Sequence, residues 1–353
     1  AYLSKFDANG SKLLYSTYIG GSDMDRAYDL FVDDAGNVYV SGSTNSDDFP
    51  VTTGAFDGSY NGGYDAYVLK LNANGSALEY ATYVGGKADE DSEYEEPNRI
   101  SVDGSGCVFL AGRTNSTDFP TTDDAVSPDH AGGNYDAYVV KVSADGISLE
   151  YSTYLGGGGN DKAFCISVDS EGNAHVGGST SSKDFPTTSG ALDTSMGGSE
   201  EGFLVKLNPS ATAFGYSTYV GGRYLDVIRG IDIDSQGRAV IGGTTNSDNF
   251  PVTTGAYDTE INGVSDLFVS TVDATGSSML SSTFIGGGLN DECKDLVLDA
   301  NGDPLVIGDT NSDDFPTTEG AFNRTKCGRT DLLVTKLDRD LSDLEYSTYI
   351  LSL

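Results

Sequence analysis

Short runs of apolar residues recur along the whole chain, and each run ends at Gly, Asn, Asp or Pro. In the first full copy the runs are residues 27–33, 38–44, 66–72 and 78–84, which we name strands A, B, C and D. Runs of this length that alternate in polarity, or are rich in β-branched and aromatic residues, are typical of β-strands. No segment has the periodicity of an amphipathic helix. The pattern therefore predicts an all-β protein built from four-stranded units.

The units follow one another at a nearly constant period. Phe-Pro recurs five times, at spacings of 70, 66, 65 and 65 residues, and a Tyr-Ser-Thr-Tyr motif or a close variant recurs six times. The Phe-Pro pairs begin at Phe49, Phe119, Phe185, Phe250 and Phe315. Four-stranded units can stack in a line or around an axis, and radial closure hides sheet edges that would otherwise promote aggregation. A β-propeller is therefore the expected architecture.

The strand count leaves one hairpin unmatched. Residues 1–5 align with residues 66–70, so the chain starts inside a strand C, and its last residues lie in a strand D. This gives five A, five B, six C and six D strands, 22 in all, in a single domain spanning residues 1–353. We place the half-repeat at residues 1–21 and the full repeats at approximately 22–86, 87–157, 158–222, 223–287 and 288–353.

Three explanations of the unmatched C–D hairpin stay open. The first is a boundary cut from a longer array of repeats. The second is a ring with one half-built blade, that is, five blades or six sectors of which one is partial. The third is pairing of the hairpin with a neighbouring subunit by strand addition.

Composite motifs cover essentially the whole chain. They are Gly-Asn-x-Tyr-Val-x-Gly-x-Thr-x-Ser-x-Asp-Phe-Pro, then Asp-Ala-Tyr-Val-x-Lys-Leu, then Tyr-Ser-Thr-Tyr-Leu-Gly-Gly. In these motifs the chain resembles the SBBP-type beta-propeller repeat of secreted and cell-surface bacterial and archaeal proteins. The resemblance implies a fold and a cellular setting. It implies no activity, because propellers host many unrelated functions.

The charge balance excludes several classes of partner. Acidic residues outnumber basic ones, 54 to 20, which gives a formal net charge of −34. Such a chain would be repelled by nucleic acid and by anionic membrane surfaces. No run of 18 apolar residues suggests membrane insertion, and the first residues lack the segments of a signal peptide. We expect an extracellular or cell-surface protein whose signal peptide has been removed or lies outside this chain.

Few residues suggest catalysis. The chain has two histidines, His130 and His175, and neither has the spacing of a nucleophile or zinc site. A glycosidase-type carboxylate pair is conceivable among 54 acidic residues, but the acidity is spread over every repeat, as on a solvated surface. We therefore expect a non-enzyme.

Recurring Asp residues in the loops suggest calcium, which binds six to eight oxygen ligands. One set follows the Gly pair after strand D, with Glu95 at the aligned place of the second repeat, and another precedes Phe-Pro, with Asn249 in the fourth copy. The alternative is that these side chains cap turns. The candidate ligands are Asp25, Asp48, Asp118, Asp161, Asp184, Asp226, Asp291 and Asp314. Calcium is the only cofactor that the sequence suggests.

Two charged segments are candidate interaction sites. An acidic insertion at residues 87–96 includes Glu93, Glu95 and Glu96, and a basic stretch at residues 323–329 includes Arg324, Lys326 and Arg329. Their opposite charges could bring subunits together. The four cysteines allow three pairings, of which Cys107 with Cys165 and Cys293 with Cys327 join the nearest repeats.

Two functions remain open. The first is a structural or interaction module in adhesion, a surface layer or a fibre, whose partner is itself, another surface protein or a polysaccharide. The second is a carbohydrate-binding or carbohydrate-active propeller with its site in the axial loops.

Overall fold

The computed structural model describes residues 1–90 and 98–350, and within them it contains 22 β-strands and no helix. The strands form one two-stranded sheet and five four-stranded antiparallel sheets. Their bounds are β1 Tyr2–Phe6, β2 Leu13–Tyr18, β3 Asp25–Val32, β4 Val38–Thr44, β5 Asp65–Leu71, β6 Leu78–Val84, β7 Arg99–Val102, β8 Val108–Thr114, β9 Asp136–Val142, β10 Leu149–Leu155, β11 Asp161–Val168, β12 Ala174–Thr180, β13 Glu201–Leu207, β14 Phe214–Val220, β15 Asp226–Ile233, β16 Ala239–Thr245, β17 Asp266–Val272, β18 Met279–Ile285, β19 Asp291–Leu298, β20 Pro304–Thr310, β21 Asp331–Leu337 and β22 Leu344–Ile350.

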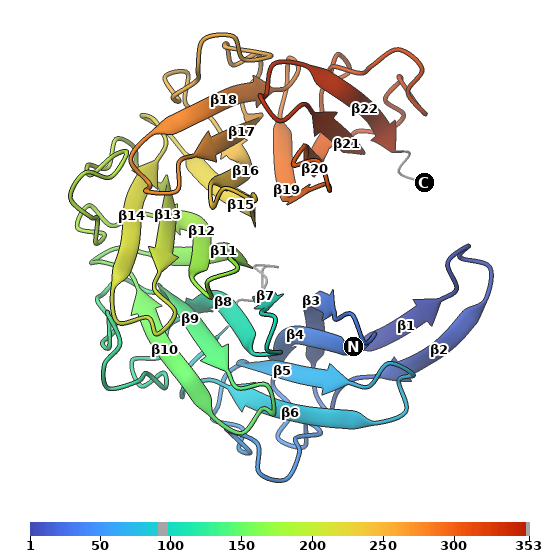
Figure 1. Cartoon of the computed structure of the whole chain (residues 1–353), viewed down its shortest axis with the longest axis vertical. Helices are drawn as coiled ribbons and strands as arrows, with labels where there is room; N and C mark the ends of the chain where they lie inside the picture. Colours follow the sequence, from blue (N-terminus) through green and yellow to red (C-terminus); the bar gives the residue numbers. More distant parts are fainter. Residues whose placement is uncertain (91–97, 351–353) are drawn as a thin grey trace.

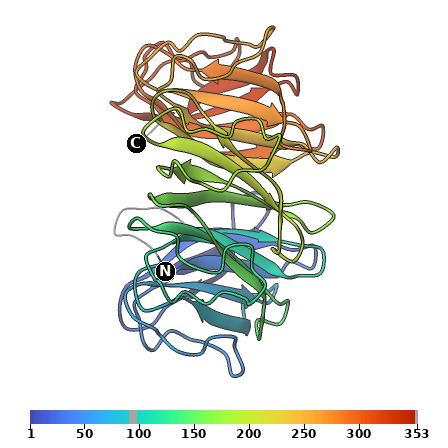
Figure 2. The same ribbon diagram turned by 90° about the vertical axis from the view of Figure 1, so that its left-hand side faces the viewer.

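The sheets follow one another around an arc that does not close (Figure 1). Each four-stranded sheet is one blade with its strands in sequence order, A to D, and the A strands β3, β7, β11, β15 and β19 pack side by side on the inner side. The hairpin β1–β2 occupies the C and D positions before the first blade. In Figure 2 the blades lie one above the next, from the blue N-terminal blade at the bottom to the red C-terminal blade at the top. The expected all-β, propeller-like architecture is confirmed.

In the first four complete blades, strands B and C are buried along nearly their whole length. All seven residues of β4, β8, β12 and β16 are buried, because other strands flank them within the sheet and neighbouring blades cover both faces. This explains why their sequences are continuous apolar and small runs instead of clean alternations.

A glycine in the middle of strand B lets the blade bend. At Gly178 in β12, a Cβ atom would overlap the carbonyl oxygen of Lys162 and the ring of Phe203. The facing strand β11 has a β-bulge between Ala163 and Cys165 at this point. The Gly of the recurring Val-x-Gly-x-Thr pattern is therefore explained by the close approach of the backbones of strands A and B.

The Phe-Pro and Tyr-Ser-Thr-Tyr motifs hold the long B–C loop against the outer strands. Phe49 is buried, with its ring 4.5 Å from that of Tyr67 in β5 and 5.8 Å from that of Tyr83 in β6. The Tyr83 hydroxyl donates a hydrogen bond of 2.8 Å to the carbonyl of Ser46. The same phenol-to-carbonyl bond is made by Tyr154, Tyr219 and Tyr349.

The expected disulfides are wrong, because all four cysteines are free thiols. Cys165 and Cys293 are buried in the A strands β11 and β19, whereas Cys327 is exposed in a B–C loop. Two cysteines in the same repeat need not be close enough for a disulfide, which requires a narrow geometry. Cys293 and Cys327 share a blade but lie on separate elements, the A strand and the B–C loop.

Candidate sites at the blade junctions and the open seam

The Asp residues that follow the Gly pair begin strand A and fasten the turn between two blades. Asp161 Oδ2 accepts hydrogen bonds from Gly157 N at 2.9 Å and Ser182 Oγ at 2.7 Å. Its Oδ1 accepts one from Thr180 Oγ1. Burial raises the pKa of Asp161, and these donors oppose that shift. We call this arrangement the Gly-turn latch; it recurs at Asp226 and Asp291, and in reduced form at Asp25.

The Asp residues that precede Phe-Pro approach the same turn from its other side. Asp184 Oδ1 accepts a hydrogen bond of 2.8 Å from Gly158 N, one residue beyond the glycine that Asp161 holds. The turn therefore lies between both sets of predicted ligands. The equivalent contacts are made by Asp48, Asp118, Asn249 and Asp314.

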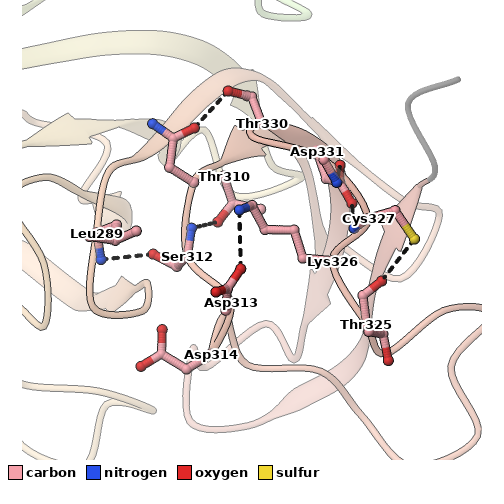
Figure 3. Close-up of polar contacts among 12 residues, drawn as sticks. Leu289, Thr310, Ser312, Asp313, Asp314, Thr325, Lys326, Cys327, Thr330 and Asp331 are labelled. Carbon is pink, nitrogen blue, oxygen red and sulfur yellow. Dashed lines mark hydrogen bonds and ion pairs between the residues drawn. The ribbon is translucent and has the colours of Figure 1, made fainter.

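Calcium binding at these residues stays a prediction. Figure 3 shows the turn of the last blade, where Ser312 Oγ accepts a hydrogen bond from Leu289 N and Asp314 lies beside the same loop. Among residues 1–90 and 98–350, no group of three or more His, Cys, Asp or Glu side chains is arranged to hold a metal ion. The observed hydrogen bonds are those of turn caps.

Glu90, and not Glu95, stands at the latch position of the second blade. Glu90 Oε1 accepts hydrogen bonds from Thr114 Oγ1 at 2.9 Å and from Ser116 Oγ, as Asp161 does from its own Thr and Ser. The sequence predicted Glu95 for this position, because the spacing of this repeat is about six residues longer than that of the others; the hydrogen bonds to Thr114 and Ser116 assign it to Glu90. Glu95, together with Glu93 and Glu96, lies outside the described residues.

Sequence reasoning missed a second acidic residue at the junctions that follow the first three complete blades. There the first residue of strand C is buried, and its carboxyl group and the latch carboxyl group lie beside the same glycine, the first of the turn. Burial raises the pKa of Glu201 to about 7 and that of Asp266 to about 6. The signal was present, because every C strand after the first hairpin begins with Asp or Glu; these residues are Asp65, Asp136, Glu201, Asp266 and Asp331.

Shallow polar grooves lie between the A–B turns of adjacent blades. One of them has a volume of about 570 Å³, and Asp169, Lys206 and Asp234 are among the residues that line it. The buried His175 lies behind it, with Nε2 3.1 Å from Asp169 Oδ2 and Nδ1 3.2 Å from the Tyr216 hydroxyl. Burial lowers the pKa of His175 to about 4. The neutral imidazole therefore orients Asp169 and has no free nitrogen for catalysis.

The two ends of the arc expose side chains that other blades bury. Tyr2 in β1 is 73% exposed, whereas its equivalent Tyr67 in β5 is 0% exposed. At the other end, Leu332 in β21 is 52% exposed, whereas its equivalent Leu267 is 0% exposed. Strand β1 pairs only with β2, whereas β5 pairs with strands on both sides. We call β1–β2 and the facing end of the β19–β22 blade the open seam.

The basic stretch of the last B–C loop is engaged within its own blade. Lys326 Nζ lies 3.1 Å from Asp313 Oδ1, as Figure 3 shows. Arg324 Nε donates a hydrogen bond of 3.3 Å to Thr317 Oγ1. Whether Arg324, Lys326 and Arg329 contact a partner stays a prediction, and Glu93, Glu95 and Glu96 of the acidic insertion proposed to face them lie outside the described residues.

These features define the chain as an open, propeller-like protein in which the Gly-turn latch recurs between successive blades. The SBBP family model, described as "Beta-propeller repeat", matches residues 14–50, 150–186 and 215–251 of the chain. Each match runs from strand D through the Gly turn and strands A and B to Phe-Pro, so it contains the Gly-turn latch. The resemblance stated from the sequence is confirmed.

Known structures resemble the chain at low identity. Hydrazine synthase of Kuenenia stuttgartiensis is 11% identical with a TM-score of 0.46, over 91% of this chain and 66% of that chain. NanB sialidase of Streptococcus pneumoniae (K499G mutant) is 10% identical with a TM-score of 0.45, over 98% and 62%. BamB of Moraxella catarrhalis is 8% identical with a TM-score of 0.41, over 99% and 82%. The chain thus spans less than two thirds of the first two. The search of curated proteins found no match.

Within the described residues, no helix is long and apolar enough to span a membrane.

Proposed function

We propose that the chain is a non-enzymatic structural and interaction module of an extracellular or cell-surface protein, and that it assembles through its open seam. In this proposal β1 and β2 occupy the C and D positions of a sixth sector. The seam offers two kinds of contact to a second copy of the chain: the free edge of β1 for strand addition, and the exposed apolar side chains on both sides of the opening.

The observation that carries the proposal is the contrast between equivalent residues. Tyr18, at the end of β2, is 93% exposed, whereas Tyr83 at the end of β6 is 1% exposed. Large apolar side chains concentrated at one place on a surface mark interaction sites more often than scattered ones do. The carbohydrate alternative draws on the groove beside Asp169 and Lys206, whose polar lining could bind sugar hydroxyl groups.

The test is the molar mass by light scattering over a concentration series, for the wild type and for the double variant Tyr2→Thr with Tyr18→Thr. The wild type should exceed 36.9 kDa as its concentration rises. The dissociation constant of the double variant should be at least tenfold higher than that of the wild type. A tenfold change corresponds to a loss of about 1.4 kcal/mol in the free energy of association. Thr keeps the strand propensity of both positions.

The matched control is Tyr224→Thr, which removes an exposed tyrosine from a turn between blades away from the seam. It should associate like the wild type. A constant monomeric mass at every concentration would contradict the assembly proposal, and binding of the monomer to a glycan array would then favour the carbohydrate function.

A further inference from the structure

Asp65 and Glu90 bring two buried carboxyl groups together at the junction of the first two complete blades. Asp65 begins β5, and Glu90 follows the Gly turn after β6; both are fully buried. They lie on the same side of Gly85, where an added Cβ atom would be 2.7 Å from Asp65 Oδ1 and 2.6 Å from Glu90 Oε2. The two side chains are within hydrogen-bonding reach of each other.

Each carboxyl group has one oxygen that is satisfied and one that is not. Asp65 Oδ2 accepts a hydrogen bond of 2.8 Å from Asn61 N, and Glu90 Oε1 accepts those from Thr114 and Ser116. Asp65 Oδ1 and Glu90 Oε2 are buried without a hydrogen-bond partner. These two oxygens are the ones that face each other. Two facing acceptors need a donor between them, because an unpartnered buried oxygen is costly.

A proton fits this gap better than a metal ion. Calcium needs six to eight oxygen ligands, and only two free carboxyl oxygens converge here. No third His, Cys, Asp or Glu completes a metal-binding group in the described part of the chain. Two buried carboxylates side by side cannot both be charged without a large penalty, and sharing one proton removes half of that charge.

We propose that Asp65 Oδ1 and Glu90 Oε2 bind one proton between them, and that this proton holds the first blade to the second. The inference is independent of the assembly proposed above, because neither residue belongs to the hairpin β1–β2 or to the β19–β22 blade. Among the junctions in the described residues, only this one has Glu at the latch position, and Glu90 approaches Asp65 on the same side of Gly85; the other junctions have Asp there.

The surroundings reinforce the tendency to keep a proton. Burial is the main cause that raises the pKa of both Asp65 and Glu90, and it outweighs the hydrogen bonds that lower these pKa values, from Asn61 to Asp65 and from Ser116, Thr114 and Gly86 to Glu90; the carboxylate of Asp57 raises that of Asp65 further. The other titratable groups that face the pair are phenols from the B–C loop, from β6 and from β10; they are Tyr60, Tyr83 and Tyr154.

The sign of the pH dependence follows from the raised pKa values. A group whose pKa is higher in the folded state stabilises that state fully below its unfolded value, and this contribution is lost as the pH rises through the folded value. The ordinary values are 3.8 for Asp65 and 4.5 for Glu90. The junction should therefore weaken as the pH rises from about 5 into the alkaline range, and unfolding at about pH 6 should release protons.

The experiment measures urea unfolding of the wild type and Glu90→Gln across this pH range. If unfolding of the wild type releases one shared proton, its unfolding equilibrium constant increases by up to about tenfold per pH unit. That of the variant lacks this increase. Gln keeps the hydrogen bonds to Thr114 and Ser116 through its carbonyl and can donate its amide to Asp65 Oδ1. Glu79→Gln, which alters a half-exposed carboxylate paired with Lys70 in the same blade, is the control and should follow the wild type.

Equal pH dependence of the wild type and Glu90→Gln would overturn the proposal. So would stabilisation by calcium of the wild type but not of Glu90→Gln, since a metal would then occupy the gap. If Glu90→Gln does not fold, calorimetric unfolding of the wild type in buffers of different ionisation enthalpy decides, and absence of proton release at about pH 6 contradicts the shared proton.

Discussion

The tyrosine that closes most D strands anchors a loop of roughly twenty residues with a single hydroxyl group. In the third complete blade the Tyr219 hydroxyl donates a hydrogen bond of 2.7 Å to the Ser182 carbonyl, directly beside the Phe185 ring. Burial raises the pKa of this phenol to about 12, so it remains a donor over the whole physiological range. The fourth blade has Phe284 at this position, with the same ring packing and no hydroxyl group.

Replacing Tyr219 by Phe and Phe284 by Tyr measures how much this hydrogen bond contributes to the free energy of unfolding. Tyr219→Phe should lower the free energy of unfolding by about 1 kcal/mol, because the buried Ser182 carbonyl loses its partner. Phe284→Tyr should have the opposite sign or no effect, since it can restore the bond in the one blade that lacks it. Urea unfolding of both variants checks the pair, and equal destabilisation by both would contradict a role for the hydroxyl group.

At the scale of the element, the central glycine of strand B and the bulge opposite it act together to bend the blade. The bulge in β11 turns strand A away from the sheet, and the missing side chain of Gly178 in β12 admits the Lys162 carbonyl. Strand A can then twist toward the next blade while its ladder to strand B continues on both sides of the bulge.

Gly178→Ala should therefore destabilise the protein by about 2 kcal/mol or more, because the added methyl group overlaps backbone that cannot move away. Gly104→Ala is the matched control: its added Cβ meets nothing within 4 Å, so its effect should stay below about 0.5 kcal/mol. Thermal unfolding distinguishes them, and a Gly178→Ala protein as stable as the control would show that the contact relaxes freely.

Strands were predictable where local sequence determines them. Strands B and D of the first complete blade, residues 38–44 and 78–84, were predicted with the observed bounds, because turn residues flank them. Strand A starts at Asp25, two residues before the predicted start, since the bulge extends its pairing to Thr44. The Asp65–Glu90 pair was not predictable, because it joins two blades and the insertion obscures the alignment at Glu90.

At the scale of the whole molecule, the net charge of −34 opposes the packing of blades against one another. Cations are few and are used locally, as where Lys336 lies 2.9 Å from Asp299 and 3.1 Å from Asp303. In the part of the chain that the structure describes, most acidic side chains outside the junctions lie on loops and turns, where salt can screen them.

Salt should therefore stabilise the fold. Raising the ionic strength from about 0.01 M to 1 M shortens the Debye length from about 30 Å to 3 Å and removes most of the long-range repulsion. The urea midpoint at pH 7 should rise. Association through the seam should also strengthen at high salt if the contact is apolar. A contact through Arg324, Lys326 and Arg329 should weaken instead. Light scattering at both salt concentrations distinguishes the apolar contact from the ionic one.

The open arc also determines how the molecule comes apart. In a closed ring every blade has two neighbours, and removing any blade breaks two interfaces. Here the hairpin β1–β2 and the β19–β22 blade each pack against one neighbour, so losing either breaks one interface. Unfolding is then a process with two starting points that advances inward, and the middle blade, β11–β14, is the last to lose its protection from solvent exchange.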